Sequence, residues 1–142
     1  MPPIDLTALR HELHRMPELG FAEESTKMRI AGILEDLGIE THIGVGVVGV
    51  LKRGVGNRAI GLRADMDALP IHETSSHDYA SRTAGVMHAC GHDGHMTMLL
   101  GAAAALAEEA EFDGTVLFIF QPNEEHGLGA QAMIAEGLLE RF

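Results

Sequence analysis

The feature that most constrains the fold is a short, almost entirely apolar segment near the end of the chain, residues 114–120 (GTVLFIF). Its length and its nearly continuous apolar character predict a β-strand. A strand without alternating polar positions is typical of the centre of a sheet that is covered on both faces. Such a strand needs neighbouring strands on both sides and helices packed above and below. The segment therefore favours a layered α/β architecture.

The rest of the chain supplies the other elements of this architecture. Apolar residues at helical spacing predict helices over residues 4–16, 23–37, 92–109 and 130–139. Asp5 is the expected N-cap of the first helix. Residues 39–52, rich in Gly and Val, predict a strand or hairpin, and residues 58–65 predict a second strand. Residues 66–89 lack periodicity, so we expect a long extended loop of the kind that is usually functional or mobile.

The charge balance limits the classes of partner. Ten Lys and Arg residues against 21 Asp and Glu residues give a net charge of −11, which repels nucleic-acid phosphates and anionic membrane surfaces. The single cysteine excludes an internal disulfide and suits a reducing compartment. The first residues lack the pattern of a signal peptide, and no apolar run reaches the ~18 residues of a membrane helix. We therefore expect a cytoplasmic protein that binds neither nucleic acid nor membranes.

Three short segments gather polar side chains that can bind metal ions. RADMD (residues 63–67) ends one predicted strand, QPNEE (121–125) follows the apolar strand, and HACGHDGH (88–95) leads into a predicted helix. In open α/β sheets, functional sites form at the carboxyl ends of the strands. We therefore expect the three segments to meet at one edge of the sheet.

The segment HACGHDGH is the strongest candidate for metal binding, with three His, one Cys and one Asp within eight residues. Thiolate, imidazole and carboxylate groups together suit Zn, Mn, Co or Ni better than Ca or Mg. Cys90 and His92 are two positions apart, so in an extended segment they would face the same side and bind one ion. The alternative is an inert cysteine next to histidines that merely begin a helix. The histidine and the acidic residues close to Cys90 favour the metal-binding interpretation.

The segment QPNEE places two carboxylates, Glu124 and Glu125, directly after the apolar strand. Like charges this close raise each other's pKa unless a cation neutralises them. The simplest hypothesis divides the roles: one glutamate binds metal, and the other acts as a general base on the attacking water. A solvated acidic turn is the alternative.

The segment RADMD places Asp65 and Asp67 on one face of a strand end, where either could bind metal or hold a catalytic group by a hydrogen bond. It could equally be an ordinary strand end at the surface. His88 and His95, within HACGHDGH, and His126, directly after QPNEE, stay without an assigned role. The remaining histidines are expected to lie at the surface or to be satisfied by neighbours: His11, His14, His42, His72 and His77.

Four stretches of the sequence resemble, in order and spacing, the N-terminal part of the metal-dependent amidohydrolases. They are LHRMPELGFAEE, LRADMDALPI, MHACGHDGHMTMLLGAA and FQPNEEHGLGAQAMI. That family includes hippurate hydrolases, N-acyl-amino-acid amidohydrolases and plant auxin-conjugate hydrolases, within the aminoacylase–carboxypeptidase group of dinuclear metallohydrolases. The resemblance covers nearly the whole chain, and CGHDGH followed by QPNEE is a highly specific pair.

The resemblance implies an α/β catalytic domain like that of the zinc peptidases, two divalent metal ions (Mn, Zn, Co or Ni) and an N-acyl amino acid as substrate. Cys90, His92 and Glu125 match metal ligands of the family, and Glu124 matches the general base. Asp67 matches the aspartate near the base and the metal centre. The implied reaction is hydrolysis of the amide of, for example, a benzoyl amino acid, in which Glu124 moves a proton from water to the leaving amine.

Members of the family are typically much longer than 142 residues. Their later histidine ligands, closing strands and smaller lid domain, through which they commonly dimerise, have no counterpart here. The resemblance therefore implies that residues 1–142 form the N-terminal part of the catalytic domain, inactive alone, of a protein that is a homo-oligomer through its lid. Two other hypotheses stay open: a non-catalytic module that binds a metal or a partner, and a hydrolase whose nucleophile is Cys90, paired with His92 or His95.

Overall fold

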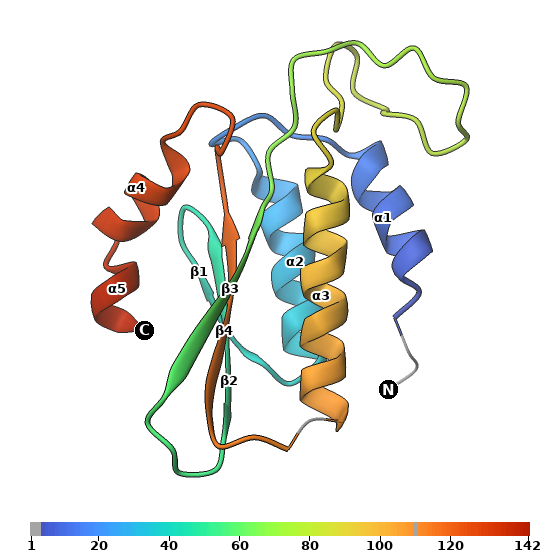
Figure 1. The fold of residues 1–142 in the computed structure, drawn as a ribbon. Helices are drawn as coiled ribbons and strands as arrows, with labels where there is room; N and C mark the ends of the chain where they lie inside the picture. Colours follow the sequence, from blue (N-terminus) through green and yellow to red (C-terminus); the bar gives the residue numbers. More distant parts are fainter. Residues whose placement is uncertain (1–3, 110) are drawn as a thin grey trace.

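A computed structural model describes residues 4–109 and 111–142, which form a layered α/β structure around one sheet (Figure 1). The order of strands across the sheet is β1 (Glu40–Ile43), β2 (Val47–Arg53), β4 (Gly114–Gln121) and β3 (Ala59–Asp65). The apolar strand β4 therefore lies between two neighbours, as its sequence predicts. It is antiparallel to β2 and parallel to β3. The predicted α/β class is confirmed.

Helices cover both faces of this sheet (Figure 1). They are α1 (Leu6–Arg15), α2 (Glu24–Asp36), α3 (His92–Glu109), α4 (Gly129–Ala135) and α5 (Leu138–Arg141). Helices α2 and α3 cover one face, and α1 packs on the outside of α3; α4 and α5 lie on the other face. Alternate residues of β4 serve the two sides: Phe118 and Phe120 join the core with α2 and α3, whereas Leu117 packs near Met133 of α4. The strand is apolar on both faces because both faces are covered.

The register of β3 and β4 brings two of the polar segments to the same edge of the sheet. Asp65, the last residue of β3, pairs with Gln121, the last residue of β4. Just beyond, the Met66 N–H donates to the Gln121 carbonyl at 3.0 Å. Helix α3 begins at this same edge, shown at the top of Figure 1. RADMD, QPNEE and the start of α3, which lies within HACGHDGH, therefore meet at this edge, as expected.

Most predicted elements end within one or two residues of their expected bounds, and one differs. The Asp5 carboxylate accepts the Ala8 N–H at 3.0 Å and caps α1, and residues 66–89 form a loop with only isolated bridges, such as Leu69 with Met87. The helix expected over residues 130–139 is instead divided into α4 and α5, because Gly137 adopts a left-handed conformation (φ 91°) that interrupts helical hydrogen bonding.

No helix in the described ranges is long and apolar enough to cross a membrane. Residues 1–3, which belong to the N-terminal segment compared above with a signal peptide, lie outside the described residues.

Gly129 offers a test of how tightly the turn after β4 is packed. A Cβ at this position would collide with the Pro122 carbonyl oxygen, whereas a Cβ at Gly32 in α2 would meet nothing within 4 Å. In the whole protein, Gly129→Ala is expected to lower the free energy of unfolding by about 1–3 kcal/mol. Gly32→Ala, the control, is expected to raise it by about 0.5–1 kcal/mol. Urea unfolding followed by circular dichroism measures both, and equal stability of the Gly129 variant and wild type would contradict the packing argument.

Candidate metal centre

His92 is the best-defined member of the site because its hydrogen bonds fix the state of its ring. It is the first residue of α3 and is buried. Its Nδ1 lies 2.8 Å from the Asp67 backbone carbonyl oxygen and 3.2 Å from Asp67 Oδ1. Both atoms are acceptors, so Nδ1 carries a proton and donates it. The Nε2 lone pair is then free to bind a metal, in the arrangement common for histidine ligands.

The free nitrogen of His92 faces the two other predicted ligands. Ligand atoms of Cys90, His92 and Glu125 all lie within 4.8 Å of one another, and His92 Nε2 is 3.6 Å from Glu125 Oε1. Two ligands of one tetrahedral zinc ion are separated by about 3.5 Å, given metal–ligand bonds of ~2.0–2.3 Å. The three side chains are therefore spaced as ligands of a single ion.

One atom of this group shows that the residues fit a cation. Glu125 Oε1 is buried and has no hydrogen-bond partner among the described residues. A buried carboxylate oxygen without a partner is costly. A divalent ion held also by a thiolate and an imidazole would satisfy it, and this donor set suits Zn, Mn, Co or Ni.

The electrostatics of Cys90 and His92 agree with this fit. A hydrogen bond with the Glu125 carboxylate is the main cause that raises the pKa of the Cys90 thiol above its ordinary value, and the charges of Glu125, Glu124 and Asp65 add to it. Burial alone would lower the pKa of His92, but the hydrogen bond to Asp67 and the charges of Asp65 and Asp67 raise it overall. Both shifts report a negative field at the site, which favours a positive charge there.

The route by which Cys90 and His92 come together differs from the extended segment expected from their spacing. Cys90 lies in a bend, and His92 already belongs to α3. Gly91 between them has φ +87°, a left-handed conformation that reverses the chain direction at the start of the helix. The two side chains converge because of this turn.

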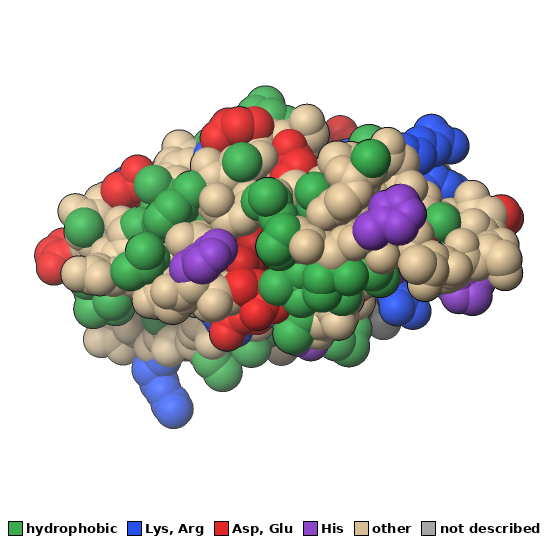
Figure 2. Space-filling model, turned by 90° about the horizontal axis from the view of Figure 1, so that it is seen from above, with side chains coloured by type: hydrophobic (Ala, Val, Ile, Leu, Met, Phe, Trp, Pro, Cys, Tyr) green, Lys and Arg blue, Asp and Glu red, His purple; other side chains and the backbone are tan. Residues whose placement is uncertain are grey.

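Glu124 lies beside the three candidate ligands but is more open to solvent. Its Oε2 is 3.6 Å from His92 Nε2, and its side chain is 40% exposed, against 22% for Glu125. From above, acidic side chains show at the centre of the upper face between hydrophobic side chains and histidines (Figure 2). This exposure leaves Glu124 accessible to water and substrate, which supports the division of roles between the two glutamates.

The Asp67 carboxylate is hydrogen-bonded to the backbone of both glutamates. Its Oδ1 accepts the Glu124 N–H and its Oδ2 accepts the Glu125 N–H, each at 3.0 Å. Burial opposes its ionisation, but the hydrogen bonds from His92, Glu125 and Glu124 outweigh burial and hold the pKa of Asp67 below its ordinary value. Both carboxylate oxygens of Asp67 therefore accept hydrogen bonds that orient the backbone of the two glutamates.

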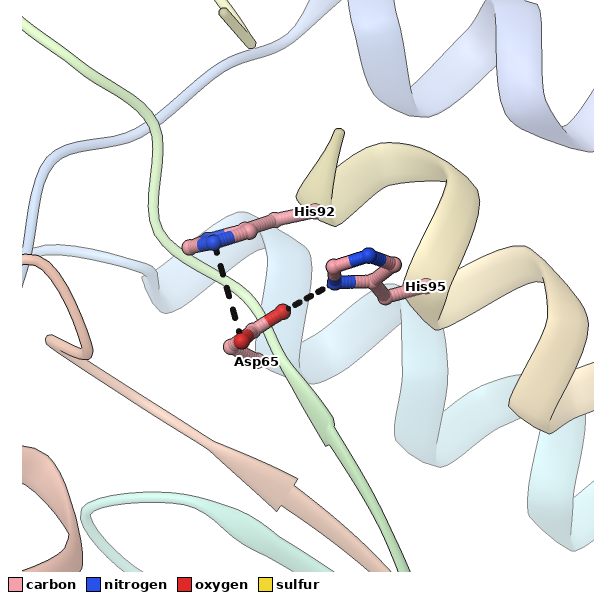
Figure 3. A group of neighbouring side chains, drawn as sticks. All are labelled: Asp65, His92 and His95. Carbon is pink, nitrogen blue, oxygen red and sulfur yellow. Dashed lines mark hydrogen bonds and ion pairs between the residues drawn. The ribbon is translucent and has the colours of Figure 1, made fainter. Parts of the chain in front are cut away.

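Asp65 and His95 also belong to the site, although the sequence left their roles open. Asp65, at the end of β3, lies below the rings of His92 and His95 at the start of α3 and contacts both (Figure 3). Its Oδ1 is 2.7 Å from His95 Nδ1, and its Oδ2 is 3.0 Å from Arg63 Nη1 and 3.6 Å from His92 Nε2. Asp65, His92 and His95 are close enough to hold an ion, but the Arg63 guanidinium opposes a cation at Asp65. The arrangement orients His95 next to the candidate ligands.

A second group of buried polar residues anchors the start of α3. The ring nitrogens of His14 lie 2.8 Å from Asp93 Oδ2 and 2.6 Å from Glu73 Oε1, so this histidine is satisfied, as expected. His88 is also buried, and burial lowers its pKa to about 4, which leaves it neutral at pH 7. The contacts of His14 join α1 to the long loop through Glu73 and to the first turn of α3 through Asp93.

The sequence of residues 61–142, more than half of the chain, matches the model of Peptidase family M20/M25/M40. The chain is 52% identical over 137 residues to a hippurate hydrolase of Campylobacter jejuni, covering 94% of this chain and 36% of that protein. It is 44% identical over 138 residues to IAA-amino acid hydrolase ILR1-like 5 of Arabidopsis thaliana, covering 95% of this chain and 32% of that protein.

A solved structure shows the same arrangement of elements. The Bacillus subtilis YXEP protein, described as a dinuclear metal binding peptidase from the M20 family, superposes with a TM-score of 0.89 at 42% identity, over 95% of this chain and 39% of that one. The chain spans about a third of the length of the curated relatives it matches. By the match of residues 61–142 and these similarities, the chain belongs to Peptidase family M20/M25/M40.

Proposed function

We propose that residues 1–142 are the N-terminal part of the catalytic domain of a protein that hydrolyses the amide bond of N-acyl amino acids with two divalent metal ions. The observation that carries the proposal is the buried Oε1 of Glu125, which has no hydrogen-bond partner within residues 4–109 and 111–142 and lies within 4.8 Å of ligand atoms of Cys90 and His92. Relatives named for the hydrolysis of hippurate and of IAA-amino acids support the substrate class, since hippurate is itself an N-acyl amino acid.

In this proposal Cys90, His92 and Glu125 hold metal, and the remaining residues position and move protons. Bound divalent ions supply polarisation of the substrate carbonyl and a lowered pKa of water. Glu124 takes a proton from the attacking water as the water oxygen bonds to the carbonyl carbon. It then gives that proton to the nitrogen as the carbon–nitrogen bond breaks, which releases a carboxylic acid and an amino acid. Asp67 keeps Glu124, Glu125 and His92 in place throughout.

The alternative of a Cys90 nucleophile is disfavoured by the electrostatics of the thiol. A nucleophilic cysteine depends on a lowered pKa, provided by positive neighbours. The carboxylate of Glu125 instead raises the pKa of Cys90. Without a cation, the thiol is protonated at neutral pH and is a poor nucleophile.

The proposal is tested by removing and restoring metal in the whole protein. Activity on a panel of benzoyl-, acetyl- and indoleacetyl-amino acids is expected to disappear after dialysis against a chelator. It is expected to return with Mn, Zn, Co or Ni. Metal binding without hydrolysis of any panel member would favour the non-catalytic module. Hydrolysis that is insensitive to the chelator but lost when Cys90 is alkylated would favour the thiol mechanism.

A further inference from the structure

We propose that Glu23 is a positioning residue for the hydrolysis reaction: it holds the backbone amide of Asn123 and thereby fixes the turn that presents Glu124 and Glu125. The catalytic part of this inference rests on the proposed function. Its structural part, the fixing of the turn by a carboxylate far away in sequence, does not.

Glu23 makes a direct contact across 100 positions of sequence. Its Oε1 accepts the Asn123 N–H at 2.8 Å, and the residue is 1% exposed. Burial raises the pKa of Glu23, and the hydrogen bond from Asn123 opposes that rise. A carboxylate withdrawn so completely from water is costly unless it is hydrogen-bonded. Here its donor is a backbone N–H one residue before the proposed base.

The turn that Glu23 holds has an unusual backbone. Asn123 has a positive φ of 44°, in the left-handed region that residues other than glycine seldom adopt. In this conformation three consecutive N–H groups point inward, and two buried carboxylates accept them: Glu23 accepts that of Asn123, and Asp67 those of Glu124 and Glu125. Each carboxylate thus holds a different part of one turn.

The segment before α2 is packed directly against this turn. A Cβ at Gly20 would collide with the side-chain oxygen of Asn123. That oxygen is already 2.7 Å from His126 Nδ1, so the Asn123 side chain is held from both sides. The Glu23 backbone carbonyl meanwhile accepts the Lys27 N–H in the first turn of α2. Glu23 therefore connects the start of α2 rigidly to the turn that carries the glutamates.

Loss of the Glu23 carboxylate would leave a buried N–H without a partner and release one of the two carboxylates that hold the backbone of the turn. The Glu124 N–H would still be bonded to Asp67, but the turn would be less rigid. The Glu124 carboxylate would then sample positions away from the reacting water. A displacement of about 1 Å in a catalytic group can cost about 10²-fold in rate. Binding of substrate, which does not depend on the proton transfer, would change little.

The experiment compares Glu23→Ala, Glu23→Gln and the control Glu24→Ala in the whole protein. Glu24 is the next residue in sequence, and its side chain is 74% exposed. Glu23→Ala is expected to lower kcat by about 10- to 100-fold with little change in KM. Glu23→Gln keeps an oxygen that accepts the Asn123 N–H and is expected to restore most of the activity. Glu24→Ala should match wild type.

A second measurement follows the turn without catalysis. Hydrogen–deuterium exchange of the metal-free protein should be faster in peptides spanning residues 121–127 for Glu23→Ala, with no change for Glu24→Ala. Wild-type exchange and wild-type kcat in Glu23→Ala would overturn the proposal. Equal loss of activity in the Ala and Gln variants, with faster exchange throughout α2, would also overturn it in favour of a general role in stability.

The two arms separate this inference from the proposed function. If the wild-type protein hydrolyses no member of the substrate panel, the proposed function fails. Faster exchange of residues 121–127 in Glu23→Ala would still show that Glu23 holds the turn, and unchanged exchange would reject that as well.

Discussion

Glu124→Gln in the whole protein is expected to lower kcat by about 10²- to 10⁴-fold, the usual contribution of a general base. Glutamine has the same size as glutamate but cannot take a proton from water. The Glu124 side chain is 40% exposed and lies outside the group of candidate ligands formed by Cys90, His92 and Glu125. Its replacement should therefore leave the bound metal unchanged. Steady-state kinetics and metal analysis of the same preparation measure the two effects.

The adjacent residue provides the matched control. Glu125→Gln removes the negative charge from the buried oxygen proposed as a metal ligand, so this variant should lose metal as well as activity. Loss of metal from the Glu124 variant, together with high residual turnover, would show that the two glutamates have the opposite roles.

The convergence of the site was predictable because it follows from the pattern of the strands. The apolar segment 114–120 indicated a central strand, and its parallel pairing with β3 places Asp65 and Gln121 at the same level. Any polar residues that follow two such strands must emerge at one edge of the sheet. The motifs supplied the candidate metal-binding and catalytic residues, and the strand pattern predicted that these residues lie together.

The residues that orient the site were harder to predict because nothing local marks them. Glu23 looks like one of several acids at the start of a helix, and only a contact across 100 positions shows that it is buried beneath the turn. In the sequence, His14 likewise looks like an ordinary helix residue, and only the structure shows its contacts with Glu73 and Asp93. His95 did leave a signal, since it follows His92 by three positions and therefore shares its face of the helix.

The division of the last helix shows a different limit. Residues 130–139 have helical periodicity on both sides of Gly137, and one glycine inside a helix costs only about 1 kcal/mol. Periodicity therefore does not reveal whether the chain continues or turns there. Gly137 adopts a left-handed conformation that ends α4 and separates it from α5.

Cys90→Ser in the whole protein is expected to weaken metal binding by at least about 100-fold, since even residues outside the ligand shell affect affinity by 10- to 100-fold. A serine hydroxyl stays protonated at neutral pH and is a poor ligand where a thiolate is a good one. Metal content after dialysis measures the loss, and Cys90→Ala should lose as much. Because Cys90 is exposed, alkylation at alkaline pH, where the thiol ionises, gives an independent test: mass spectrometry should find Cys90 labelled by iodoacetamide in metal-free protein and protected after loading with zinc. Unchanged metal content in both variants, with equal labelling in the two states, would remove Cys90 from the site and leave His92 and Glu125 to bind metal with other residues.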